Sequence, residues 1–151
     1  MRDLVNAGHK VHTTIQHYEA RPATAQEADT LKITEGTLVV HIERTRFADN
    51  EPIAVLTNLI PADIAPTMQE LESASLYDLM RERGVTLASA RQIIGARSAT
   101  TKEAKLLSEH RGAALLTSQR TTYDPSGRIV ECGNHIYRAS RYSFEASLFA
   151  Q

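Results

Sequence analysis

Apolar and polar side chains alternate along several stretches of the chain, and this period of two is typical of half-buried β-strands. In the stretch from Leu38 to Phe47, for example, Leu38, Val40 and Ile42 share one face. Turn sequences such as Asp-Pro-Ser-Gly at 124–127 separate the stretches and predict hairpins. The predicted strands are Val11–Tyr18, Leu38–Phe47, Ile53–Ile60, Ala88–Ala96, Ala114–Tyr123, Ile129–Ala139 and a short last strand at Tyr142–Phe149.

Three segments carry helix signals instead. Two of them open with a capping box, in which a threonine and a glutamate three residues later satisfy the free N–H groups of a helix start. The boxes are Thr24–Glu27 and Thr100–Glu103, and the helices should end near Lys32 and Ser108, ahead of Gly36 and Gly112. The third helix is expected at Ser75–Arg83, where the apolar residues fall on one side.

The two capped helices belong to an internal repeat. Shifting the sequence by 76 positions places residues 20–53 on residues 96–129 with 11 identities and no gap. Each copy reads strand–helix–strand–strand, so the chain should form one pseudo-symmetric domain over residues 1–151. The expected fold class is α+β, with a mostly antiparallel sheet and helices packed against one side of it.

Composition narrows the classes of function. The 151 residues carry a net charge of −1, which provides no basic surface for nucleic acid or an anionic membrane. No apolar run reaches the roughly 20 residues of a membrane-spanning helix. The single cysteine, Cys132, excludes an internal disulfide, and the six histidines form no metal motif. We therefore expect a cytoplasmic protein without metal or cofactor.

The strongest candidate chemistry lies where the first copy departs from the second. The apolar face of Leu38–Phe47 continues as Arg44 and Arg46, whose side chains should lie about 7 Å apart along the strand. Arginine offers a planar pair of donors for phosphate or carboxylate. The repeat counterparts are Arg120 and Thr122, so the double-arginine clamp would belong to the first copy alone. Alternatively, both arginines reach solvent or pair with nearby glutamates.

A second polar face is expected on Ile129–Ala139. Glu131, His135 and Tyr137 would share it, and Glu131 and Tyr137 could hydrogen-bond a hydroxyl-bearing ligand. A solvated sheet face is the alternative. Ser75 should cap the third helix, and a helix start also attracts anions.

The same residues carry a family resemblance. The markers include Arg44–Ile53, Ser75-Leu76-Tyr77, Arg120–Asp124, Val130-Glu131 and Tyr137-Arg138, in that order along nearly the whole chain. In this the chain resembles the effector-binding (UTRA) domain of GntR-type transcriptional regulators of the HutC subfamily. The resemblance implies a chorismate-lyase-like fold and a domain that senses a ligand.

Residue roles follow from the resemblance. Arg44 and Arg46 would contact the anionic end of an effector with help from Ser75, and Glu131 and Tyr137 would contact the rest. Tyr77 and His135 join them as candidate ligand-binding residues. Members that sense phosphorylated sugars usually have an acid ten positions after the second arginine, where this chain has Leu56. This departure argues against an amino-sugar phosphate.

Three hypotheses remain at this point. In the first, the chain is the effector-binding, dimerising domain of a bacterial repressor, and DNA contact comes from a winged-helix domain outside this chain. In the second, it is a lyase that acts on a chorismate-like dianion. In the third, it is an interaction module without a ligand. A closed apolar pocket would favour this third hypothesis.

Overall fold

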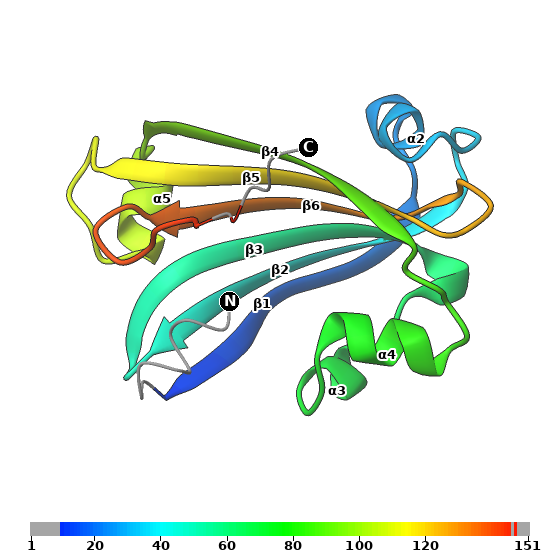
Figure 1. Cartoon of the computed structure of the whole chain (residues 1–151), viewed down its shortest axis with the longest axis horizontal. Helices are drawn as coiled ribbons and strands as arrows, with labels where there is room; N and C mark the ends of the chain where they lie inside the picture. Colours follow the sequence, from blue (N-terminus) through cyan, green and yellow to red (C-terminus); the bar gives the residue numbers. More distant parts are fainter. Residues whose placement is uncertain (1–9, 146, 148–151) are drawn as a thin grey trace.

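The computed structural model describes residues 10–145 and 147. Within them, six antiparallel strands form one sheet in the order β1-β2-β3-β6-β5-β4 (Figure 1). The strands are β1 Val11–Pro22, β2 Leu38–Ala48, β3 Glu51–Pro61, β4 Ser89–Ser98, β5 Ala114–Tyr123 and β6 Ile129–Arg138. The helices are α2 Ala25–Leu31, the 3-10 turn η1 Ala62–Ile64, α3 Met68–Leu71, α4 Leu76–Glu82 and α5 Thr101–Leu106.

This architecture confirms the predicted α+β class and six of the seven predicted strands. The last predicted strand, Tyr142–Phe149, is wrong over residues 142–145 and at 147, which are irregular. Residues 146, 148 and 149 lie outside the described part of the chain. The segment between the two copies also contains η1 and α3, which the sequence pattern did not predict.

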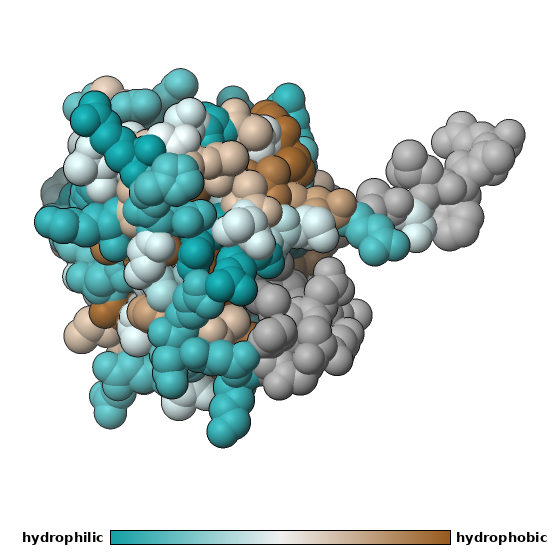
Figure 2. Space-filling model, turned by 90° about the vertical axis from the view of Figure 1, so that its left-hand side faces the viewer, coloured by the Kyte–Doolittle hydropathy of each residue, from teal (hydrophilic) through white to brown (hydrophobic). Residues whose placement is uncertain are grey.

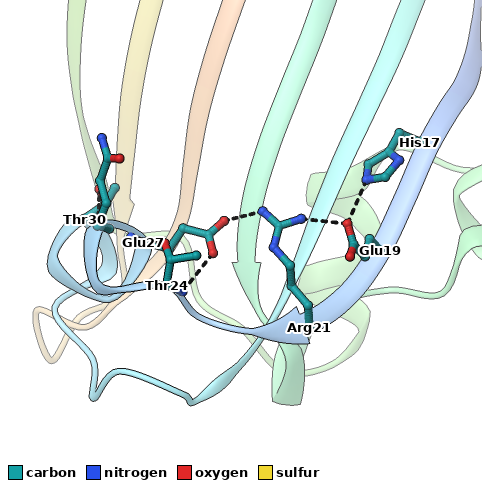
Figure 3. Close-up of polar contacts among 7 residues, drawn as sticks. His17, Glu19, Arg21, Thr24, Glu27 and Thr30 are labelled. Carbon is teal, nitrogen blue, oxygen red and sulfur yellow. Dashed lines mark hydrogen bonds and ion pairs between the residues drawn. The ribbon is translucent and has the colours of Figure 1, made fainter.

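The repeat appears as two three-stranded halves that meet along β3 and β6 (Figure 1). Both predicted capping boxes are formed, with Thr24 accepting from the Glu27 N–H and Thr100 from the Glu103 N–H. In each copy an arginine at the end of the preceding strand binds the capping glutamate. Figure 3 shows the first case, in which Arg21 joins Glu27 to Glu19.

Helices cover both faces of the sheet, so the expectation of one covered face was wrong. The neighbours Val39 and Val40 of β2 point to opposite faces, and both are at most 4% exposed. Val39 packs with Leu31 of α2, whereas Val40 packs with Leu79 of α4. The helix α5 lies on the α2 face, where α2 and α5 sit near opposite ends of the sheet (Figure 1).

The outermost strand of the second half is the least covered part of the sheet. Every residue of β4 is exposed, and the side chains of Ile93 and Ile94 are 50% and 45% exposed. Figure 2 shows that one end of the molecule is mainly hydrophilic, with apolar side chains gathered toward one edge. An open strand edge with apolar side chains is suited to pairing with another chain.

Candidate functional site

The α4 face of the sheet contains a cavity of about 570 Å³. Strand pairing sets its floor as two rows of side chains. In the first row Arg44, Leu56, His135 and Ser118 stand side by side across β2, β3, β6 and β5. The next row is Ile42, Asn58, Gly133 and Arg120, of which Asn58 and Arg120 line the cavity. The cavity is therefore built from both copies of the repeat.

Six of the seven predicted site residues line this cavity, although they come from three elements. They are Arg44 and Arg46 from β2, Ser75 and Tyr77 from the start of α4, and His135 and Tyr137 from β6. Ser75 is the N-cap of α4, as predicted, and its hydroxyl accepts the Asp78 N–H at 3.3 Å. The seventh, Glu131, lies beneath them and is fully buried.

The Glu131 carboxylate is the centre of a hydrogen-bond network. One oxygen accepts from the Asn58 amide at 2.8 Å, and the other accepts from the hydroxyls of Thr122 at 2.9 Å and Tyr77 at 3.2 Å. Burial raises the pKa of Glu131, against the lowering effect of these donors and of Arg120. Because its oxygens are already occupied, Glu131 holds α4 and β3 in place under the cavity.

The three arginines of the cavity leave donors free. Arg44 donates through Nη2 to the Asn58 side-chain oxygen at 2.9 Å. The Nε atoms of Arg44, Arg46 and Arg120 are buried and have no hydrogen-bond partner within the described residues. Burial, followed by the neighbouring Arg46, lowers the pKa of Arg44. The lining of the cavity therefore includes three guanidinium groups whose buried Nε atoms have no acceptor in the described structure.

The alternative in which glutamates pair with Arg44 and Arg46 does not occur in the described structure. Glu43 accepts from Gln16 at 2.9 Å, and Glu51 binds Arg138 at 2.9 Å and Arg141 at 2.7 Å. Over residues 10–145 and 147, neither arginine lies within 4.0 Å of a carboxylate oxygen.

His135 is held as a neutral imidazole. Its Nδ1 accepts the backbone N–H of Thr57 at 3.2 Å, which places the proton on Nε2. Burial, with the charges of the three arginines, lowers its pKa to about 4. Gly133 gives the ring its room, since a Cβ there would lie 2.7 Å from Nε2. His135 can therefore donate one hydrogen bond into the cavity.

Aromatic side chains close one side of the cavity. The ring of Tyr137 lies 4.7 Å from that of Tyr142 and 5.4 Å from that of Phe144. Burial raises the pKa of both Tyr137 and Tyr77 to about 12, so both phenols keep their protons at neutral pH. Together with Leu56, the rings of Tyr77, Tyr137 and Phe144 give the cavity apolar lining between its arginines.

Residues 6–143 match the UTRA domain family. This chain belongs to the UTRA domain family. It is 46% identical to a Streptomyces coelicolor protein described as a transcriptional regulator, with a TM-score of 0.87 over 95% of this chain and 96% of that one. The ligand-binding domain of a Bordetella bronchiseptica protein described as a GntR-family transcriptional regulator gives 26% identity and a TM-score of 0.84, over 93% and 91% of the two chains.

The chain is also similar to part of a longer transcriptional repressor. The HTH-type transcriptional repressor NagR of Bacillus subtilis is 29% identical over 94% of this chain. The chain spans 59% of the length of NagR. The proteins named here are all transcriptional regulators, which favours the regulatory hypothesis over the lyase.

The cavity also contains Arg120 and Asn58, which were not among the predicted site residues. Arg120 is the repeat counterpart of Arg44, so the repeat itself held the signal. The sheet order places β2 and β5 on either side of the central pair β3–β6, and their arginines therefore face one cavity.

Three further features of the described residues lie outside this cavity. A cavity of about 610 Å³ lies on the other face beneath α5, but its Arg97 is already paired with Glu103 at 2.6 Å. Within the described residues, no group of His, Cys, Asp or Glu side chains could hold a metal ion. No described helix has the length and apolarity to cross a membrane.

Proposed function

We propose that this UTRA domain binds a small anionic metabolite in the cavity between α4 and the sheet. The observation that carries the proposal is the set of three partly buried arginines, each with a buried Nε that has no acceptor among the described residues, around a cavity of about 570 Å³. A phosphate or carboxylate would accept from Arg44 and Arg46, with the Ser75 end of α4 beside it. Tyr77, His135 and Tyr137 would contact the remainder of the ligand, and Glu131 would act through Tyr77 and Asn58.

The wall around Leu56 suits a less polar ligand than a sugar. Leu56 stands between Arg44 and His135 in its row and is 4% exposed. A leucine cannot accept a hydrogen bond from a sugar hydroxyl, and burying that hydroxyl without a partner costs free energy. This favours a small organic acid over an amino-sugar phosphate. A closed apolar pocket, expected for an interaction module, does not match the arginine-rich lining.

The effect on DNA would follow from a shift between two arrangements of a dimer. A ligand that binds one arrangement better increases its population. We propose that a DNA-binding part outside this chain responds to that shift, because the similar protein NagR is an HTH-type transcriptional repressor. A transcription factor with this role would work in the cytoplasm.

The Arg46→Gln variant tests the anion site. We expect its affinity for inorganic phosphate and for small carboxylates to fall roughly 10- to 100-fold, because a hydrogen bond to a charged group contributes about 1.5–3 kcal/mol. Isothermal titration calorimetry in a buffer without competing anions measures the change. Arg111→Gln is the matched control, since it removes the same charge from an exposed turn. Equal affinities for wild type and Arg46→Gln would refute the site.

Dimerisation is proposed to use the open edge of β4. Replacing both Ile93 and Ile94 with Asp should raise the dimer dissociation constant roughly 100-fold, because burying each isoleucine contributes about 1.5 kcal/mol or more. Light scattering across a dilution series measures the oligomeric state. Met68→Asp removes an equally exposed apolar side chain from α3 and should leave the dimer intact. A dimer that survives the double substitution would move the interface away from β4.

A further inference from the structure

The two copies of the repeat place one arginine each on opposite sides of the central strand pair. Arg44 stands at the β2 end of its row, and Arg120 stands at the β5 end of the next row. Three strand spacings separate β2 from β5, which is about 14 Å between backbones. Both side chains line the same cavity, so their guanidinium groups approach it from its two ends.

Arg120 is held in place without being neutralised. Its guanidinium carbon lies 5.1 Å from the centre of the Tyr77 ring, a cation–π contact that orients the group. Tyr77 is itself fixed by its hydrogen bond to Glu131. In the part of the chain that the structure describes, Arg120 has no ion pair, and its buried Nε has no acceptor. The Arg120 guanidinium is therefore oriented and still has a donor that an anion could occupy.

The charges around the cavity do not balance. Among the described residues, three guanidinium groups line it, whereas the carboxylates are those of Glu145 in the lining and Glu131 beneath it. Glu131 has its oxygens occupied by Asn58, Thr122 and Tyr77. Glu145 lies at the exposed rim. A ligand with one anionic group bound at Arg44 and Arg46 would leave the Arg120 guanidinium, across the cavity, without an anionic partner.

We propose that Arg120 is a second anion-binding residue and that the effector is a compact dianion that bridges the two halves of the repeat. This inference rests on the proposed function of the same cavity. One anionic group binds Arg44 and Arg46, the other binds Arg120, and the apolar body between them lies against Leu56 and Tyr137. The ligand class that fits is a short dicarboxylate or a phosphorylated carboxylic acid.

The test compares straight-chain acids in pairs of equal length. The probes are succinate with butyrate, glutarate with pentanoate, and adipate with hexanoate, titrated calorimetrically at low salt. In the wild-type chain, the dicarboxylate of fitting length should bind at least 10-fold more tightly than its monocarboxylate partner. In Arg120→Gln this ratio should fall to about one, because the dicarboxylate loses the contact that its monocarboxylate partner never makes.

Control variants separate the two claims. Arg46→Gln should weaken both members of a pair, and Arg111→Gln should weaken neither. Arg120→Lys keeps the charge and should keep part of the ratio, provided that thermal unfolding shows each variant folded. A ratio that Arg120→Gln does not change would overturn the second anion site while leaving the proposed function standing. Affinities that Arg46→Gln does not change, or no binding by any acid, would overturn both.

Discussion

Replacing Glu131 with Leu is expected to lower the free energy of unfolding by about 3–5 kcal/mol. The carboxylate is fully buried, and so are two of its donors, Asn58 and Thr122, each 2% exposed. Leucine would leave these donors and the Tyr77 hydroxyl without an acceptor, and each unsatisfied buried group costs about 1–3 kcal/mol. It would also remove the nearest buried negative charge from the three arginines. Urea denaturation monitored by circular dichroism measures the loss.

Two other substitutions make this result specific to the buried network. Glu131→Gln keeps a side-chain oxygen of similar reach and should cost less than Glu131→Leu. Glu35→Leu removes an exposed carboxylate and should change the free energy of unfolding by no more than about 0.5 kcal/mol. If Glu131→Leu were as stable as Glu35→Leu, the network would not hold α4 against the sheet.

The strands and caps could be predicted because their causes are local. Alternation depends on neighbouring residues, and a capping box needs only a threonine and a glutamate three residues apart. The short elements η1 and α3 were missed because four residues or fewer give no hydrophobic period, although the capping box Thr67–Glu70 was a local signal for α3. The covering of both faces had a signal in Val39 and Val40. Adjacent apolar residues in a strand indicate burial on both sides, and both are at most 4% exposed.

The site could be predicted only one strand at a time. Alternation placed Arg44 with Arg46 and His135 with Tyr137, because each pair lies within a single strand. Whether β2 and β5 face a common cavity depends on the strand order, which requires that β3 pair with β6 across 78 residues. The position of Arg120 at the cavity therefore depends on the pairing of β3 with β6, which the sequence pattern of a single strand does not reveal. Glu131 was expected to contact the ligand directly, whereas the structure surrounds its carboxylate with donors from three other elements.

The partly buried His135 should make stability depend on pH. The pKa of His135 is about 4 in the folded chain and about 6.5 when unfolded, so between these values the unfolded state binds more protons. The free energy of unfolding should therefore rise with pH over this range, by about 3 kcal/mol from this group. His135→Gln should lack this part of the slope, as measured by urea denaturation at several pH values. His110→Gln is the control, because that side chain is exposed.

Urea denaturation at several pH values also tests whether ligand binding changes the pKa of His135. Burial is the first cause of the low pKa, and the charges of Arg44, Arg46 and Arg120 add to it. An anion bound to these arginines would offset their charge and raise the pKa of His135, so saturating phosphate should make the wild-type slope shallower. Glu131, whose pKa burial raises, contributes stability that is lost as pH rises, and it does so in both chains. The difference in pH dependence of the free energy of unfolding between wild type and His135→Gln therefore isolates the contribution of His135. Identical pH profiles for the two proteins would show that the pKa of His135 does not change on folding.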